Sequence, residues 1–120
     1  IKTVATTLFV NNENIFSPLR FPSKIQYSNV AAIETADVNN DGNLDILFGG
    51  NQYLVKPQFG RQDASQGWLL YGSGDKNIFN KIRTLQIRGQ IRDFWKGEIN
   101  HKKHVLATIN NESLQFYEIQ

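Results

Sequence analysis

Short apolar runs separated by turn-forming residues constrain the fold of this chain more than any other feature of its sequence. The runs are rich in β-branched and aromatic residues, and Asn, Gly, Asp, Ser or Pro stands between them, which is the pattern of strands joined by tight turns. The nine candidate strands span residues 3–10, 19–21, 31–37, 44–49, 67–71, 81–87, 91–95, 105–109 and 113–119. No long helical pattern competes with them, so the sequence predicts an all-β fold.

Composition removes several classes of protein from consideration. The 120 residues carry a formal net charge of only +2, and the basic residues are scattered, so we expect no nucleic-acid partner. No apolar stretch approaches the roughly 18 to 20 residues that a membrane span requires, and none is expected. The chain has no cysteine, which excludes disulfides and thiolate metal sites. It also has no methionine, and we expect residue 1 to be a cut point in a longer chain.

One turn carries an unusual set of oxygen-bearing side chains. Asp37, Asn39, Asp41 and Asp45 stand at positions 1, 3, 5 and 9 of a loop, and Gly42 allows a sharp turn at position 6. Such a set suits a hard cation such as calcium. An EF-hand would place Glu at position 12, where this chain has an apolar residue, and strands instead of helices are expected on both sides. The alternative is an ordinary Asp-Gly hairpin turn without metal.

Residues 36–47, which read ADVNNDGNLDIL, resemble the FG-GAP or VCBS repeat of integrin-type β-propellers and of many secreted bacterial proteins. The resemblance implies that this loop joins the first two strands of a propeller blade and holds calcium. It implies Asp37, Asn39, Asp41 and Asp45 as side-chain ligands and the carbonyl of Asn43 as a backbone ligand. The metal would be structural, since it would fasten the hairpin.

The resemblance extends over most of the chain and implies a partial β-propeller of antiparallel blades, about two to two and a half in number. Residues 60–65, which read GRQDAS, resemble a loop in the C-terminal blades of bacterial VCBS proteins. We expect residues 1–30 to end one blade, residues 31–88 to form a complete blade with the calcium loop and a long insertion, and residues 89–120 to form a degenerate C-terminal blade. Residues 93–98 lack the alternating ligands, so one calcium site is predicted.

The polar interval of residues 51–66 is long for a connection, and long ordered loops often carry function. A ligand-contacting cluster could comprise Tyr53, Arg61, Asp63, Ser65 and Trp68, with the two aromatic rings stacking on a sugar. The interpretation we favour is that Arg61 and Asp63 brace the loop through a charge-assisted hydrogen bond.

No constellation of residues predicts catalysis. The chain lacks cysteine and a nucleophile-elbow serine, and paired carboxylates occur only inside the calcium loop. We therefore expect a non-enzymatic protein, extracellular, periplasmic or on the outer cell surface, that binds a protein or glycan partner in an adhesion role. The alternative is a purely structural propeller segment of a larger surface protein or carbohydrate-active enzyme. A carbohydrate-active enzyme using Asp63 or Glu34 is a third reading. Open blade faces predict association with the remainder of the parent propeller or with another copy.

Overall fold

The computed structural model describes residues 4–74 and 81–118, and this part of the chain is all-β, as predicted. Its strands are β1 (Thr7–Asn12), β2 (Ile15–Arg20), β3 (Ala32–Ala36), β4 (Asp45–Gly49), β5 (Trp68–Tyr71), β6 (Lys81–Thr84), β7 (Ile91–Ile99), β8 (Lys102–Ile109) and β9 (Gln115–Glu118). Two short 3₁₀ helices, η1 (Ser23–Tyr27) and η2 (Pro57–Phe59), complete the described elements. The described residues include no α-helix, and none of their helices is long and apolar enough to cross a membrane.

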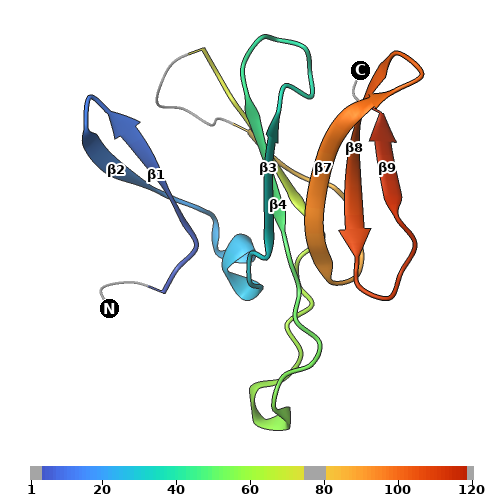
Figure 1. Cartoon of the computed structure of the whole chain (residues 1–120). Coiled ribbons are helices and arrows are strands. Elements are labelled where there is room, and N and C mark those ends of the chain that lie inside the picture. The colour runs from blue at the N-terminus through green and yellow to red at the C-terminus, as the bar shows by residue number, and fades with distance from the viewer. Residues whose placement is uncertain (1–3, 75–80, 119–120) are drawn as a thin grey trace.

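The strands form three antiparallel sheets that stand side by side (Figure 1). The hairpin β1-β2 is followed by a four-stranded central sheet of order β3-β4-β5-β6 and by a three-stranded C-terminal sheet of order β7-β8-β9. These sheets occupy residues 7–20, 32–84 and 91–118. Across the described residues they form an open stack and no closed barrel or propeller. The assignment of the sheets to propeller blades therefore stays a prediction.

Two hairpins differ in extent from the strands expected at their positions, because their turns are tighter than the sequence suggested. β2 already begins at Ile15, and Glu13 and Asn14 form the turn with φ of 50° and 69°. β7 continues to Ile99, and Asn100 and His101 turn the chain with φ of 51° and 63°. Two consecutive residues with positive φ are typical of the turns whose twist matches a β-hairpin.

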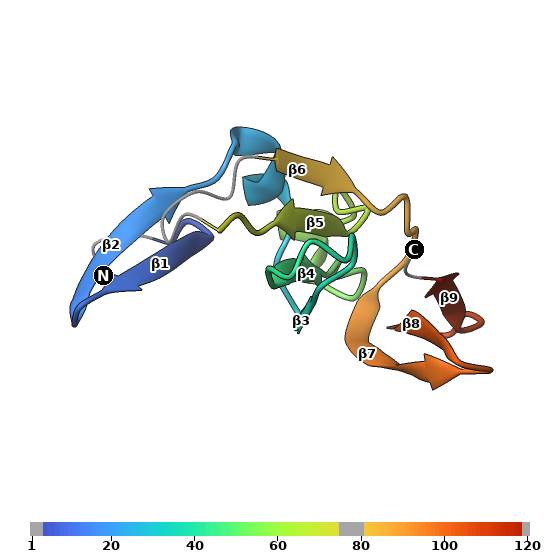
Figure 2. The same ribbon diagram turned by 90° about the horizontal axis from the view of Figure 1, so that it is seen from above.

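A buried cluster fixes the C-terminal sheet against one face of the central sheet. It comprises Ala32, Ala36, Leu47, Leu69, Ile87, Ile91, Phe94, Val105, Ala107 and Ile109. The two sheets come closest at their edge strands β3 and β7 (Figure 2). At this edge Lys96 Nζ lies 3.4 Å from Glu34 Oε1.

The opposite face of the central sheet packs against the N-terminal part of the chain. Side chains alternate along each strand, so Leu47 and Leu69 face the C-terminal sheet while their neighbours Phe48 and Leu70 face the other way. Phe48 and Leu70 join Ile25 of η1 in the second cluster, and the ring of Phe21 stacks on Phe48 with centroids 5.4 Å apart. The central sheet thus packs against other parts of the chain on both faces.

Candidate functional site

The predicted calcium loop joins β3 to β4 at the upper end of the central sheet (Figure 1). The pair Ala36 and Asp45 closes the hairpin. Within the loop Asn40 and Gly42 adopt φ of 55° and 86°, a left-handed conformation that favours Asn and Gly. A Cβ on Gly42 would meet no heavy atom within 4 Å, so this glycine is required for its backbone conformation and not for space.

The side-chain oxygens of Asp37 and Asn39 converge on one backbone amide. Asp41 N donates to Asp37 Oδ1 over 3.1 Å and to Asn39 Oδ1 over 3.2 Å. Gly42 N donates to the other oxygen of Asp37 over 3.0 Å. The oxygens at positions 1 and 3 of the loop therefore lie close together, as a shared cation would require.

The Asp41 carboxylate is solvent-exposed and is held by its neighbours in the loop. Asn43 donates to Asp41 Oδ1 from its backbone N over 2.8 Å and from Nδ2 over 3.0 Å, and Asn39 Nδ2 donates to Oδ2 over 2.7 Å. The backbone hydrogen bond from Asn43 and the side-chain bond from Asn39 lower the pKa of Asp41 from its usual value. Asp41 therefore keeps its negative charge within the loop.

Asp45 has a different environment, because its carboxylate is completely buried. Val38 N donates to its Oδ2 over 3.0 Å, and Gly72 N, just beyond β5, donates to its Oδ1 over 2.8 Å. A Cβ on Gly72 would collide with the carbonyl oxygen of Leu44, so glycine permits this close approach. Asp45 thus ties the loop to the neighbouring strand connection through two backbone amides.

The donor set of the loop fits a hard cation in its chemistry, since three carboxylates, the side-chain amide of Asn39 and the backbone carbonyl of Asn43 could supply oxygen ligands. In the structure these carboxylates accept hydrogen bonds from backbone and side-chain amides of the same loop. Among residues 4–74 and 81–118 no group of three or more His, Cys, Asp or Glu side chains is gathered as a metal site. Asp37, Asn39 and Asp41 are interlinked, while Asp45 lies beneath them on backbone partners.

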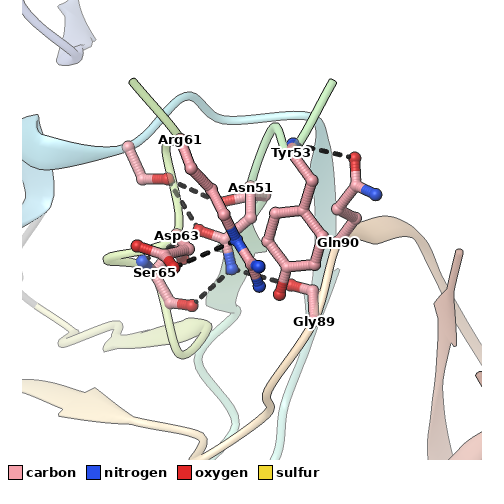
Figure 3. A network of polar contacts seen from close by, with 9 residues as sticks. Asn51, Tyr53, Arg61, Asp63, Ser65, Gly89 and Gln90 are labelled. Carbon is pink, nitrogen blue, oxygen red and sulfur yellow. Dashed lines mark hydrogen bonds and ion pairs between the residues drawn. The ribbon is translucent and has the colours of Figure 1, made fainter. Parts of the chain in front are cut away.

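Residues 51–66 form a protruding arm at the opposite end of the central sheet (Figure 1). Gln52 and Gln62 pair as an isolated antiparallel bridge. On its surface Arg61 Nε lies 3.1 Å from Asp63 Oδ2, and the guanidinium lies 3.6 Å from the centroid of the Tyr53 ring (Figure 3). The structure therefore brings Tyr53, Arg61 and Asp63 together, in a geometry that braces the arm and occupies one face of the tyrosine.

Ser65 and Trp68 are separated from this surface contact. Ser65 is 4% exposed and its Oγ accepts a hydrogen bond from Gly67 N over 3.2 Å. Trp68 is 6% exposed and packs in the second buried cluster, with Lys24 Nζ 5.3 Å from its ring. A sugar stacked on Tyr53 would therefore not reach the ring of Trp68.

Asn51, which the sequence did not single out, joins three parts of the fold beneath the arm (Figure 3). Its Nδ2 donates to the carbonyl oxygens of Ser65 over 2.8 Å and Gly89 over 2.7 Å. Its Oδ1 accepts from Ser65 N over 3.0 Å and from Ser28 Oγ over 2.7 Å. Nearby, Gln90 Oε1 accepts a hydrogen bond from Tyr53 N over 3.2 Å. In the sequence, the only sign of this role was that Asn51 follows Gly49 and Gly50. The same pattern is also typical of an ordinary turn.

Comparison with protein-family models, curated proteins and solved structures finds no match to the chain. The resemblance to FG-GAP and VCBS repeats therefore rests on the residues of the loop and its flanks.

Proposed function

We propose that this chain is a calcium-stabilised segment of a β-propeller from a secreted or surface-exposed protein, acting as a protein- or glycan-binding module. The observation that carries the proposal is the position of the Asp- and Asn-rich loop at the first hairpin of a four-stranded antiparallel sheet. One face of that sheet packs against the C-terminal sheet, and stacked sheets of this kind are the arrangement that propeller blades have, while the other face packs against η1 and neighbouring N-terminal residues.

Calcium would act in this loop as a structural ion. Asp37, Asn39 and Asp41 would hold it through their side-chain oxygens, and Asp45 and the Asn43 carbonyl would complete the set. The interlinked oxygens of positions 1 and 3 support this assignment. The ion would neutralise carboxylates that otherwise repel one another across a short turn, and it would thereby stiffen the end of the central sheet.

Calcium titration by isothermal calorimetry tests the metal directly. We expect binding at one site per chain in the wild type and its loss in Asp41→Ala, because this exposed carboxylate has no structural partner outside the loop. Asp63→Asn is the matched control, since it removes an exposed carboxylate from the arm and should leave the heat of binding unchanged. Absence of binding to the wild type, or equal binding to Asp41→Ala, would contradict the proposal.

The open face of the C-terminal sheet supports the proposal that further sheets belong to the assembly. Trp95, Leu106 and Phe116 lie directly opposite one another across β7, β8 and β9. Trp95 is 50% exposed and Phe116 is 57% exposed, so this row presents a continuous apolar strip to solvent. The remainder of the parent propeller, or another copy of the chain, would cover it. If the role of the segment were purely structural, the same strip would still pack against the rest of the parent protein.

We expect the isolated chain to self-associate through this strip, and light scattering coupled to size exclusion should report a mass above that of one chain. Phe116→Ser should shift the mass toward the monomer. Leu54→Ser is a suitable control, because Leu54 is 87% exposed but lies on the arm, away from the strip. A wild-type chain that remains monomeric at high concentration would refute self-association through this face.

A further inference from the structure

The central and C-terminal sheets converge at one edge and diverge at the other. In the view from above, β3 and β7 are close, whereas β6 and β9 stand apart (Figure 2). The salt bridge between Lys96 and Glu34 closes the converging edge. The buried cluster fills the middle of the interface between the two sheets. The space that remains therefore lies toward β6 and β9.

A groove of about 340 Å³ occupies this diverging side. Its floor is apolar and consists of Leu47 and Leu69 from the central sheet and Phe94 and Val105 from the C-terminal sheet. This volume lies at the lower end of the range of pockets that take small molecules, and the apolar floor with a few polar groups at the rim is typical of them.

Strand register places the rim residues so that they face into the groove. Arg83 lies directly opposite Leu69 across β5 and β6, and Tyr117 lies directly opposite Val105 across β8 and β9. Directly opposite residues point to the same face of a sheet. Arg83 and Tyr117 therefore line the groove from its two walls, and Tyr71, two residues after Leu69 in β5, lines it as well.

The rim carries a positive charge that pairs with no acidic side chain of residues 4–74 and 81–118. Within the described residues Arg83 takes part in no ion pair or hydrogen bond. The nearest acidic side chain of β9, Glu118, is engaged by Lys102 Nζ at 2.9 Å. Lys81 adds a second cation 5.5 Å from the Tyr71 ring. Tyr117 donates its hydroxyl to Gln115 Oε1 over 2.7 Å, so its ring is held in place.

We propose that this groove binds a small carboxylic acid with an apolar or aromatic body. The carboxylate would pair with the Arg83 guanidinium, which forms bidentate hydrogen bonds with such groups. The body would lie on the apolar floor, with the Tyr71 and Tyr117 rings beside it. An unpaired arginine above an apolar floor matches this amphiphilic chemistry better than it matches a neutral sugar or an inorganic anion. The groove borders the calcium loop at Val38, but none of the predicted calcium ligands lines it.

Titration of the ¹⁵N-labelled full chain with phenylacetate, followed by NMR, tests the proposal. We expect saturable shifts of amides in β5, β6 and β9. Arg83→Gln should weaken binding about tenfold, as expected for loss of a charge-assisted pair, while Arg83→Lys should retain part of it. Arg88→Gln, which removes an exposed arginine from the linker outside the groove, should bind like the wild type.

Two further probes separate the parts of the inference. Phenylacetamide keeps the body and lacks the charge, so it should bind much more weakly than phenylacetate. Glucuronate keeps the carboxylate on a polar body and should also bind weakly. Absence of saturable shifts with phenylacetate, equal binding of phenylacetamide, or equal binding of phenylacetate by Arg83→Gln would overturn the proposal. A clear preference for glucuronate would overturn the apolar part of it.

Discussion

Asn51→Ala is expected to lower the free energy of unfolding by about 3 kcal/mol, because the substitution removes a fully used buried amide. Asn51 is 1% exposed, and its side chain makes four hydrogen bonds to Ser28, Ser65 and Gly89. Its loss would leave backbone groups of the arm and of the linker to β7 without partners in a site that water does not reach. The segments that precede β3, β5 and β7 would lose the hydrogen bonds that join them at Asn51.

Urea denaturation of wild type and variant measures this effect. Asn51→Asp is a second test, since it preserves the size of the side chain but removes both donors, and we expect a loss of similar size. Gln62→Ala changes an exposed side chain of the same arm and should stay within about 0.5 kcal/mol of wild type. If Asn51→Ala cost no more than this control, the proposed role of Asn51 as a connection would be wrong.

Asp45→Ala is expected to cost about 2 to 4 kcal/mol, and the cost should persist when calcium is removed by a chelator. The reason is that the Asp45 carboxylate accepts hydrogen bonds from Val38 N and Gly72 N at a completely buried position. These two bonds hold the hairpin loop against the end of β5 whether or not a cation is bound.

Asp41→Ala is the matched comparison within the same loop. Its carboxylate is exposed and contacts only Asn39 and Asn43, so in chelator this variant should unfold close to wild type. Denaturation of both variants in chelator distinguishes the two aspartates. Equal stability of Asp45→Ala and wild type under these conditions would show that the buried hydrogen bonds contribute little.

Local patterns in the sequence were sufficient to predict most of the strands. The short apolar runs around Leu47 and Leu69, and the turn residues Asn100 and Gly42, are local signals of a few residues each, and the structure places a strand or a turn at each of them. The limits of β7 were less predictable, because its last residues are set by pairing with Lys102 and Lys103 of β8.

Features that depend on contacts between distant segments could not be predicted in the same way. The role of Asn51 depends on Ser28 and Gly89, which are 23 and 38 residues away in the chain. Trp68 was considered as a surface ring beside Tyr53, but the face of β5 on which it lies is decided by the packing of η1. The groove at Arg83 likewise arises from the angle between two sheets, which no local pattern encodes.

The measurement that tests the calcium-stabilised hairpin most directly is a thermal melt of wild type and Asp41→Ala, each with calcium and with chelator. Saturating calcium, at about 100 times the dissociation constant, should raise the wild-type midpoint by about 10 °C, and the variant should show no such rise. Identical wild-type melts with calcium and with chelator would contradict the account, and the loop would then be an Asp-Gly turn held by its own amides.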